Sequence, residues 1–94
     1  MRYSKFEVQV KELGSYLEIV RKNDELHIRN RRREGRLMSV STEYVSSLST
    51  MWDYDEDYDE FFKRDEILRL AMELANTPLD ERGGINEIGL LETW

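Results

Sequence analysis

The fold is decided by the stretch YLEIVRKNDELHIR, residues 16–29. Leu17 and Ile19 alternate with polar residues in its first half, and Leu26 and Ile28 repeat the alternation in its second half, so each half presents one apolar face as a strand does. The Lys-Asn-Asp triplet between the halves has turn chemistry, because Asn and Asp tolerate left-handed backbone. Strands joined by so short a turn pair antiparallel. We therefore predict a β-hairpin here.

The same period extends to both sides of the hairpin. Residues 5–10 alternate with Phe6, Val8 and Val10 on one side, which predicts a half-buried strand. After a polar turn at 31–35, residues 37–40 predict a further strand. Sequential strands with short turns pair with their neighbours. We expect an antiparallel meander of three or four strands over residues 4–41.

Beyond Ser41 the apolar period becomes helical. The spacing predicts a short helix at 43–51 and a long C-terminal helix at 59–76, which ends before Pro78 because the residue preceding a proline avoids the helical region. The predicted fold class is therefore α+β, with the long helix packed on the sheet. We expect one domain over 1–82 and a C-terminal tail at 83–94.

Composition narrows the function. The chain of 94 residues has no cysteine, which excludes disulfides, thiolate metal sites and a cysteine nucleophile. It lacks an apolar run of signal-peptide or membrane-spanning length, so we expect a soluble cytoplasmic protein without a membrane partner. It also lacks phosphate-binding loops and hydrolase or zinc-protease motifs. We predict that it is not an enzyme and needs no cofactor.

An acidic aromatic segment follows the shorter predicted helix. Its carboxylates could contact a basic protein partner, and we assign partner binding to six residues: Asp53, Tyr54, Asp55, Asp57, Tyr58 and Asp59. Asp55, Asp57, Asp59 and Glu66 also have the spacing of calcium-loop ligands, but Glu60 replaces the turn glycine and Lys63 occupies a ligand position. The simplest interpretation is a solvated linker leading to a helix N-terminus. No metal site is predicted.

The hairpin at 29–36 is basic. Arginines on a projecting turn can bind phosphates, which makes a nucleic-acid-associated protein using Arg31, Arg32, Arg33 and Arg36 the alternative function. The formal net charge of −6 opposes nucleic-acid binding, because the long-range field repels phosphate. These arginines could instead pair with the acidic segment of the same chain.

Two further features have structural interpretations. His27, the single histidine, is predicted to point outward from its strand, as a surface residue and not a metal ligand. The small core leaves room for self-association, with a homodimer formed through spare aromatic residues and the apolar tail. The prediction is a non-enzymatic interaction or accessory protein that binds a protein partner or a second copy.

The stretch from Leu70 to Arg82, which ends in Thr-Pro-Leu-Asp-Glu-Arg, resembles the C-terminal end of small uncharacterised proteins encoded by phages and prophages of Gram-positive bacteria. Those proteins share a β-rich front, an acidic middle and a final helix. The resemblance implies a cytoplasmic setting and a phage or prophage origin. It supplies no functional residues and does not extend to residues 83–94.

Overall fold

The predicted hairpin is present in the computed structural model, which describes residues 1–30, 35–50 and 64–85. Strand β1 (Leu17–Lys22) pairs antiparallel with β2 (Glu25–Asn30), in a register from Leu17↔Asn30 to Lys22↔Glu25. The turn between them places Asn23 in the left-handed region with φ 56°, which asparagine tolerates better than most residues. The sequence prediction of this hairpin is confirmed.

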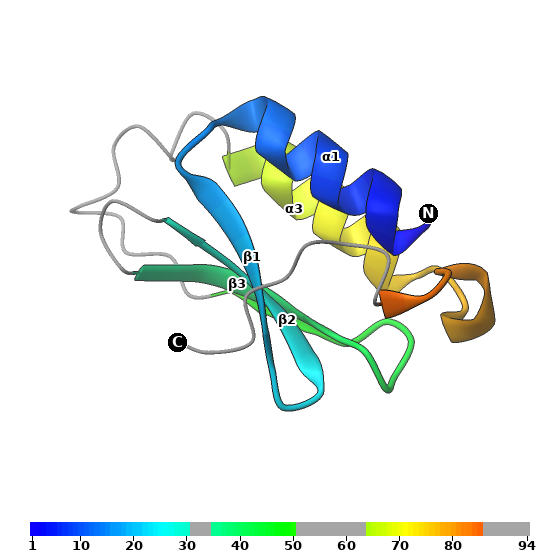
Figure 1. Cartoon of the computed structure of the whole chain (residues 1–94). Coiled ribbons are helices and arrows are strands. Elements are labelled where there is room, and N and C mark those ends of the chain that lie inside the picture. The colour runs from blue at the N-terminus through cyan, green and yellow to red at the C-terminus, as the bar shows by residue number, and fades with distance from the viewer. Residues whose placement is uncertain (31–34, 51–63, 86–94) are drawn as a thin grey trace.

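The sheet has four antiparallel strands in the order β1-β2-β3-β4. Strand β3 (Gly35–Ser41) pairs with β2, with an irregularity of register between Ile28 and Arg29. The short β4 (Leu48–Thr50) pairs with the last part of β3. Two helices, α1 (Tyr3–Leu13) and α3 (Arg64–Ala75), lie side by side on one face of this sheet (Figure 1). The fold class is therefore α+β, as predicted.

The prediction of a first strand at residues 5–10 is wrong, because this stretch belongs to α1. Tyr3, Phe6 and Val10 are buried, whereas Val8 is 54% exposed. Residues three and four positions apart share one face of a helix, and Val8 lies on the other face. The buried residues therefore follow the spacing of a helix, and the alternation over residues 5–10 does not indicate a strand. The meander begins at β1.

The prediction of a helix at 43–51 is also wrong for the described residues of that range. Residues 42–47 form the connection between β3 and β4, and Leu48–Thr50 form a strand. The hydroxyl oxygen of Ser41 does accept hydrogen bonds from the amides of Glu43 (3.1 Å) and Tyr44 (3.0 Å), as a helix cap would. Ser46, however, adopts left-handed backbone with φ 62°, which turns the chain back into the sheet.

A long C-terminal helix is not confirmed. Helix α3 covers 12 residues, and the predicted start at 59–63 lies outside the described residues. Its C-terminal end was predicted correctly, before Pro78. Asp65 and Glu66 occupy its first turn, where they complement the helix dipole. A 3-10 helix, η1 (Leu79–Glu81), follows it.

The core lies between the helices and one face of the sheet. Phe6 and Val10 of α1, together with Ile67, Leu74 and neighbouring residues of α3, pack onto the alternating apolar side chains of β1 to β3. Ile85 packs against the edge of this core, and residues 86–94 of the predicted tail lie outside the described part. Among the described residues, no helix combines the length and apolar character needed to cross a membrane.

Candidate functional site at the Arg82 end

Most residues that the sequence assigned to binding lie outside the described residues. This holds for the six of the acidic aromatic segment, Asp53 to Asp59, and for Arg31 to Arg33. The backbone of Arg36 lies in β3 opposite Arg29. The binding roles of these residues stay predictions.

His27 is not the surface residue that the sequence predicted, because only 3% of it is exposed. It lies on the sheet face opposite the helices, and its Nε2 atom is 4.0 Å from a carboxylate oxygen of Glu25. The hydroxyl of Ser39 donates to Glu25 (3.1 Å) and also pairs with the hydroxyl of Ser49 (2.8 Å). Ser39 is buried, and its hydroxyl is directed to the Glu25 carboxylate.

The opposite end of the fold is organised around Arg82, a fully buried arginine. Its guanidinium donates to three backbone carbonyl oxygens, those of Thr77 (2.9 Å, from Nε), Ser41 (2.7 Å) and Ala75 (3.0 Å). Arginine near a helix C-terminus satisfies terminal carbonyls and complements the negative end of the dipole. Arg82 therefore joins the end of α3 to the end of β3. We call this end of the molecule the Arg82 end.

Helix α1 begins at the same place. The amide of Tyr3 donates to the carbonyl oxygen of Arg82 (2.7 Å), and the Arg82 guanidinium carbon lies 5.9 Å from the centre of the Tyr3 ring, within cation-π range. Among the described residues, no carboxylate forms an ion pair with Arg82. In the described part of the chain, the buried positive charge is thus offset by carbonyl oxygens and an aromatic face.

The β3–β4 connection is bonded tightly to this end. Ser46 donates from its amide to the carbonyl oxygen of Ala75 (2.7 Å) and from its hydroxyl to Asn76 (2.7 Å). Thr42 donates from both its amide (2.8 Å) and its hydroxyl (2.9 Å) to the carbonyl oxygen of Asp24. Between these anchors, Tyr44 is 67% exposed and Val45 is 47% exposed. The connection therefore presents large side chains to solvent on a fixed backbone.

Two carboxylates border the exposed pair. The pKa of Glu43 is raised, chiefly by the negative charge of Asp24, with smaller contributions from burial and from a side-chain hydrogen bond to Asp24. A raised carboxyl pKa means that the two negative charges repel one another in the folded protein. A cation placed beside them would relieve this repulsion.

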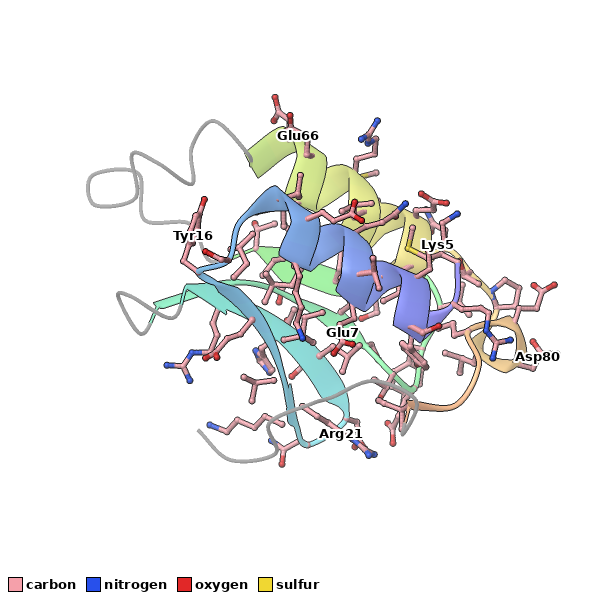
Figure 2. The ribbon with its side chains drawn as sticks, turned by 45° about the horizontal axis from the view of Figure 1, so that its top comes forward. Lys5, Glu7, Tyr16, Arg21, Glu66 and Asp80 are labelled. Carbon is pink, nitrogen blue, oxygen red and sulfur yellow. The ribbon has the colours of Figure 1, made fainter. Side chains whose placement is uncertain are left out.

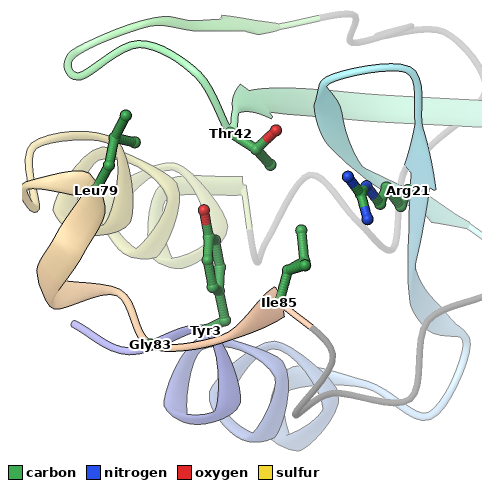
Figure 3. Close-up of a pocket in the computed structure, with 6 residues that line it drawn as sticks. All are labelled: Tyr3, Arg21, Thr42, Leu79, Gly83 and Ile85. Atoms are coloured by element: carbon green, nitrogen blue, oxygen red, sulfur yellow. The ribbon is translucent and has the colours of Figure 1, made fainter.

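A pocket of about 220 Å³ opens at the Arg82 end (Figure 3). Its wall combines α1, β1, the β3–β4 connection and the segment after α3, through six described residues: Tyr3, Arg21, Thr42, Leu79, Gly83 and Ile85. In Figure 3 the hydroxyl of Tyr3 points into the pocket, and Arg21 of β1 and Thr42 of the β3–β4 connection extend toward it. The lining thus combines polar and apolar side chains.

At the other end of the molecule, the described residues form a less favourable binding site. A depression of about 290 Å³ beside α3 is lined, among the described residues, by Asp65, Glu66 and Arg69. Figure 2 shows Glu66 and Tyr16 at this end and Asp80 at the Arg82 end. Within residues 1–30, 35–50 and 64–85, no three histidine, aspartate or glutamate side chains gather closely enough to hold a metal ion. The calcium loop considered from the sequence would need residues outside the described part.

No protein-family model, curated protein or solved structure matches the chain. The resemblance to phage and prophage proteins therefore stays a prediction.

Sequence reasoning missed the Arg82 end, because its parts come from residues 2–3, 21–24, 41–46 and 75–85. One signal was available. Arg82 follows a helix that ends at a Thr-Pro step, and a basic residue in that position can return to the helix carbonyls. The two wrong element assignments, at 5–10 and 43–51, hid the other parts.

Proposed function

We propose that the protein is a non-enzymatic interaction protein that binds a protein partner carrying a basic side chain next to an apolar surface. The observation that carries the proposal is the exposure of Tyr44 on a backbone fixed at both sides by hydrogen bonds. An aromatic residue exposed in this way gives the core little stabilisation. In a complex it would bury a large area at low entropic cost, and tyrosine is frequent among residues that dominate binding energy.

The adjoining charges favour a basic partner. Asp24 and Glu43 repel one another, as the raised pKa of Glu43 indicates. A lysine or arginine of the partner would lie in a favourable field there, while Tyr44 and Val45 cover its apolar neighbours. Charge complementarity of this kind mainly sets specificity and association rate. The formal net charge of −6 acts in the same direction at long range.

The acidic aromatic segment predicted from the sequence provides a second surface for the same function. Asp53, Tyr54, Asp55, Asp57, Tyr58 and Asp59 combine carboxylates and aromatic rings as the β3–β4 connection does. The two surfaces share no residue, so variants can separate them.

The experiment first uses the full chain as bait to capture its protein partner in cells of its source. The purified partner is then titrated into the protein by calorimetry. We expect Tyr44→Ser to weaken binding at least about 10-fold, as loss of a dominant interface tyrosine does. Val8→Ser is the matched control, because Val8 is an exposed apolar residue on a different surface. It should leave binding unchanged.

Two other variants decide between the alternatives. If replacing Asp55, Asp57 and Asp59 with asparagine abolishes binding while Tyr44→Ser does not, the site is the acidic segment and not the connection. If instead the chain binds nucleic acid at low salt with an affinity that falls steeply with salt and is lost when Arg31 to Arg33 become alanine, the protein-partner function is wrong.

A further inference from the structure

We propose that the pocket at the Arg82 end binds a small organic carboxylate with a branched apolar group, held by Arg21 and the Tyr3 hydroxyl. This site is separate from the surface around Tyr44 and does not depend on the function proposed above. It is assembled from four elements distant in the sequence. Figure 3 shows its polar side chains converging on one space.

The first argument is the position of Arg21. Alternation along β1 places Arg21 in the same row as Leu17 and Ile19, which face the core. Arg21 is half-buried in this row, and its guanidinium extends toward the pocket (Figure 3). Among the described residues, no carboxylate forms an ion pair with Arg21. Its planar donors suit a carboxylate bidentately.

The second argument is the hydroxyl of Tyr3. Tyr3 is only 5% exposed, and its hydroxyl points into the pocket (Figure 3). The hydroxyl thus stands at the end of a buried ring and faces the space of the pocket, where a ligand oxygen can bond to it.

The third argument concerns the sign of the charge around the pocket and the shape of the pocket. Arg82 contributes a second positive charge beside the Tyr3 ring, and among the described residues its guanidinium donates to carbonyl oxygens. Asp24 and Glu43 lie on the neighbouring turns and oppose an anion, but both are exposed, so salt screens their repulsion. Leu79 and Ile85 add apolar side chains to the lining. These features favour an anion with a short hydrocarbon group, and a volume of about 220 Å³ limits its size.

The experiment is an amide chemical-shift titration of the full chain with 4-methylpentanoate. We expect millimolar binding, with the largest shifts at Thr42, Gly83 and Ile85. Acetate, which lacks the branch, and 4-methylpentan-1-ol, which lacks the charge, should each bind more weakly. The carboxylate could belong to a free acid or to the carboxyl terminus of a peptide, and N-acetyl-leucine distinguishes the two. If it binds more tightly than 4-methylpentanoate, the ligand is a peptide terminus. If it binds equally or more weakly, the ligand is a free acid.

Variants connect the shifts to the named groups. Arg21→Gln should weaken binding at least about 10-fold, since hydrogen bonds to charged groups are among the stronger ones. Tyr3→Phe keeps the packed ring and should weaken binding about 5-fold. Arg69→Gln, which removes one exposed positive charge from α3, should have no effect. The proposal is wrong if no shifts appear at millimolar ligand, if the alcohol binds as well as the acid, or if neither Arg21→Gln nor Tyr3→Phe weakens binding.

Discussion

The Arg82 end and the charged segments predicted from the sequence differ in how their residues are distributed along the chain. The arginine cluster at 31–36 and the acidic aromatic segment at 53–59 are each contiguous in the sequence. At the Arg82 end, the pocket and the anchored β3–β4 connection combine residues separated by up to 82 positions, as Tyr3 and Ile85 are. A charge run is visible in a sequence, whereas an assembled site appears only when the fold is known. The Arg82 end is therefore the more informative of the two.

The largest expected effect on the free energy of unfolding comes from replacing Arg82, the residue that holds this end together. Replacement of Arg82 by methionine keeps the apolar stem and leaves three carbonyl oxygens without their donors. We expect a loss of about 3–4 kcal/mol in the free energy of unfolding, measured by urea denaturation. Arg69→Met, on the exposed face of α3, is the control and should cost less than about 0.5 kcal/mol. A similar, small cost for both variants would show that Arg82 does not organise its end.

A smaller effect is expected at Gly83. This residue has φ 82°, a conformation that residues with a Cβ atom rarely adopt. An added Cβ would also lie 2.7 Å from the Arg2 guanidinium, but that flexible group can move aside. We expect Gly83→Ala to lower the free energy of unfolding by about 1–2 kcal/mol because of the backbone strain alone. An unchanged denaturation midpoint would mean that the segment after η1 is not held in this conformation.

Tyr44 should contribute very little to stability. Because its side chain is mostly exposed, Tyr44→Ser should change the free energy of unfolding by less than about 0.5 kcal/mol. Thermal denaturation of the purified variant tests this. A marked loss would indicate that Tyr44 packs inside the fold, and the interaction proposal would then lose its main support.

The smallest effect is expected from Glu43, and it should depend on pH. Its pKa is raised in the folded protein by Asp24, so the folded state binds the proton more readily than the unfolded state. The resulting penalty is absent below the ordinary glutamate range and appears as pH rises through the raised pKa. Glu43→Gln should therefore stabilise the protein relative to wild type near neutral pH and have less effect in acid.

Salt provides the control for this assignment. Added salt should reduce the difference at neutral pH, because both carboxylates are exposed and their repulsion is screened. If the wild type is instead the more stable protein at neutral pH, the repulsion between Asp24 and Glu43 is not the cause of the raised pKa.

Some elements depend on residues close together in the sequence and others on distant residues, and this difference also explains which elements could be predicted. The β1–β2 hairpin was found because its register and its turn at Asn23 are determined within 14 residues. Helix α1 was missed because Phe6, Val8 and Val10 alternate, and only the burial of Tyr3 and the exposure of Val8 distinguish a helix. Strand β4 is three residues long and gains its stability from pairing with β3, which no local pattern records.

The residues proposed for binding also differ in whether a local sequence pattern reveals them. Residues 53–59 and 31–36 were singled out by charge alone, and their roles stay predictions. The sequence analysis assigned no role to Arg21, since nothing in the sequence brings Tyr3 or Gly83 near it. Contacts of this kind depend on α1 lying on the sheet, and that position was predicted wrongly.

The central claim is that the β3–β4 connection at the Arg82 end is the surface that binds a protein partner. Site-specific photo-cross-linking in source cells tests it most directly, with the photoreactive residue introduced at Tyr44 or, as the matched exposed position, at Val8. We predict one discrete cross-linked adduct from position 44 and none from position 8. A discrete adduct from position 8 alone, or the absence of any adduct from position 44, would contradict the claim.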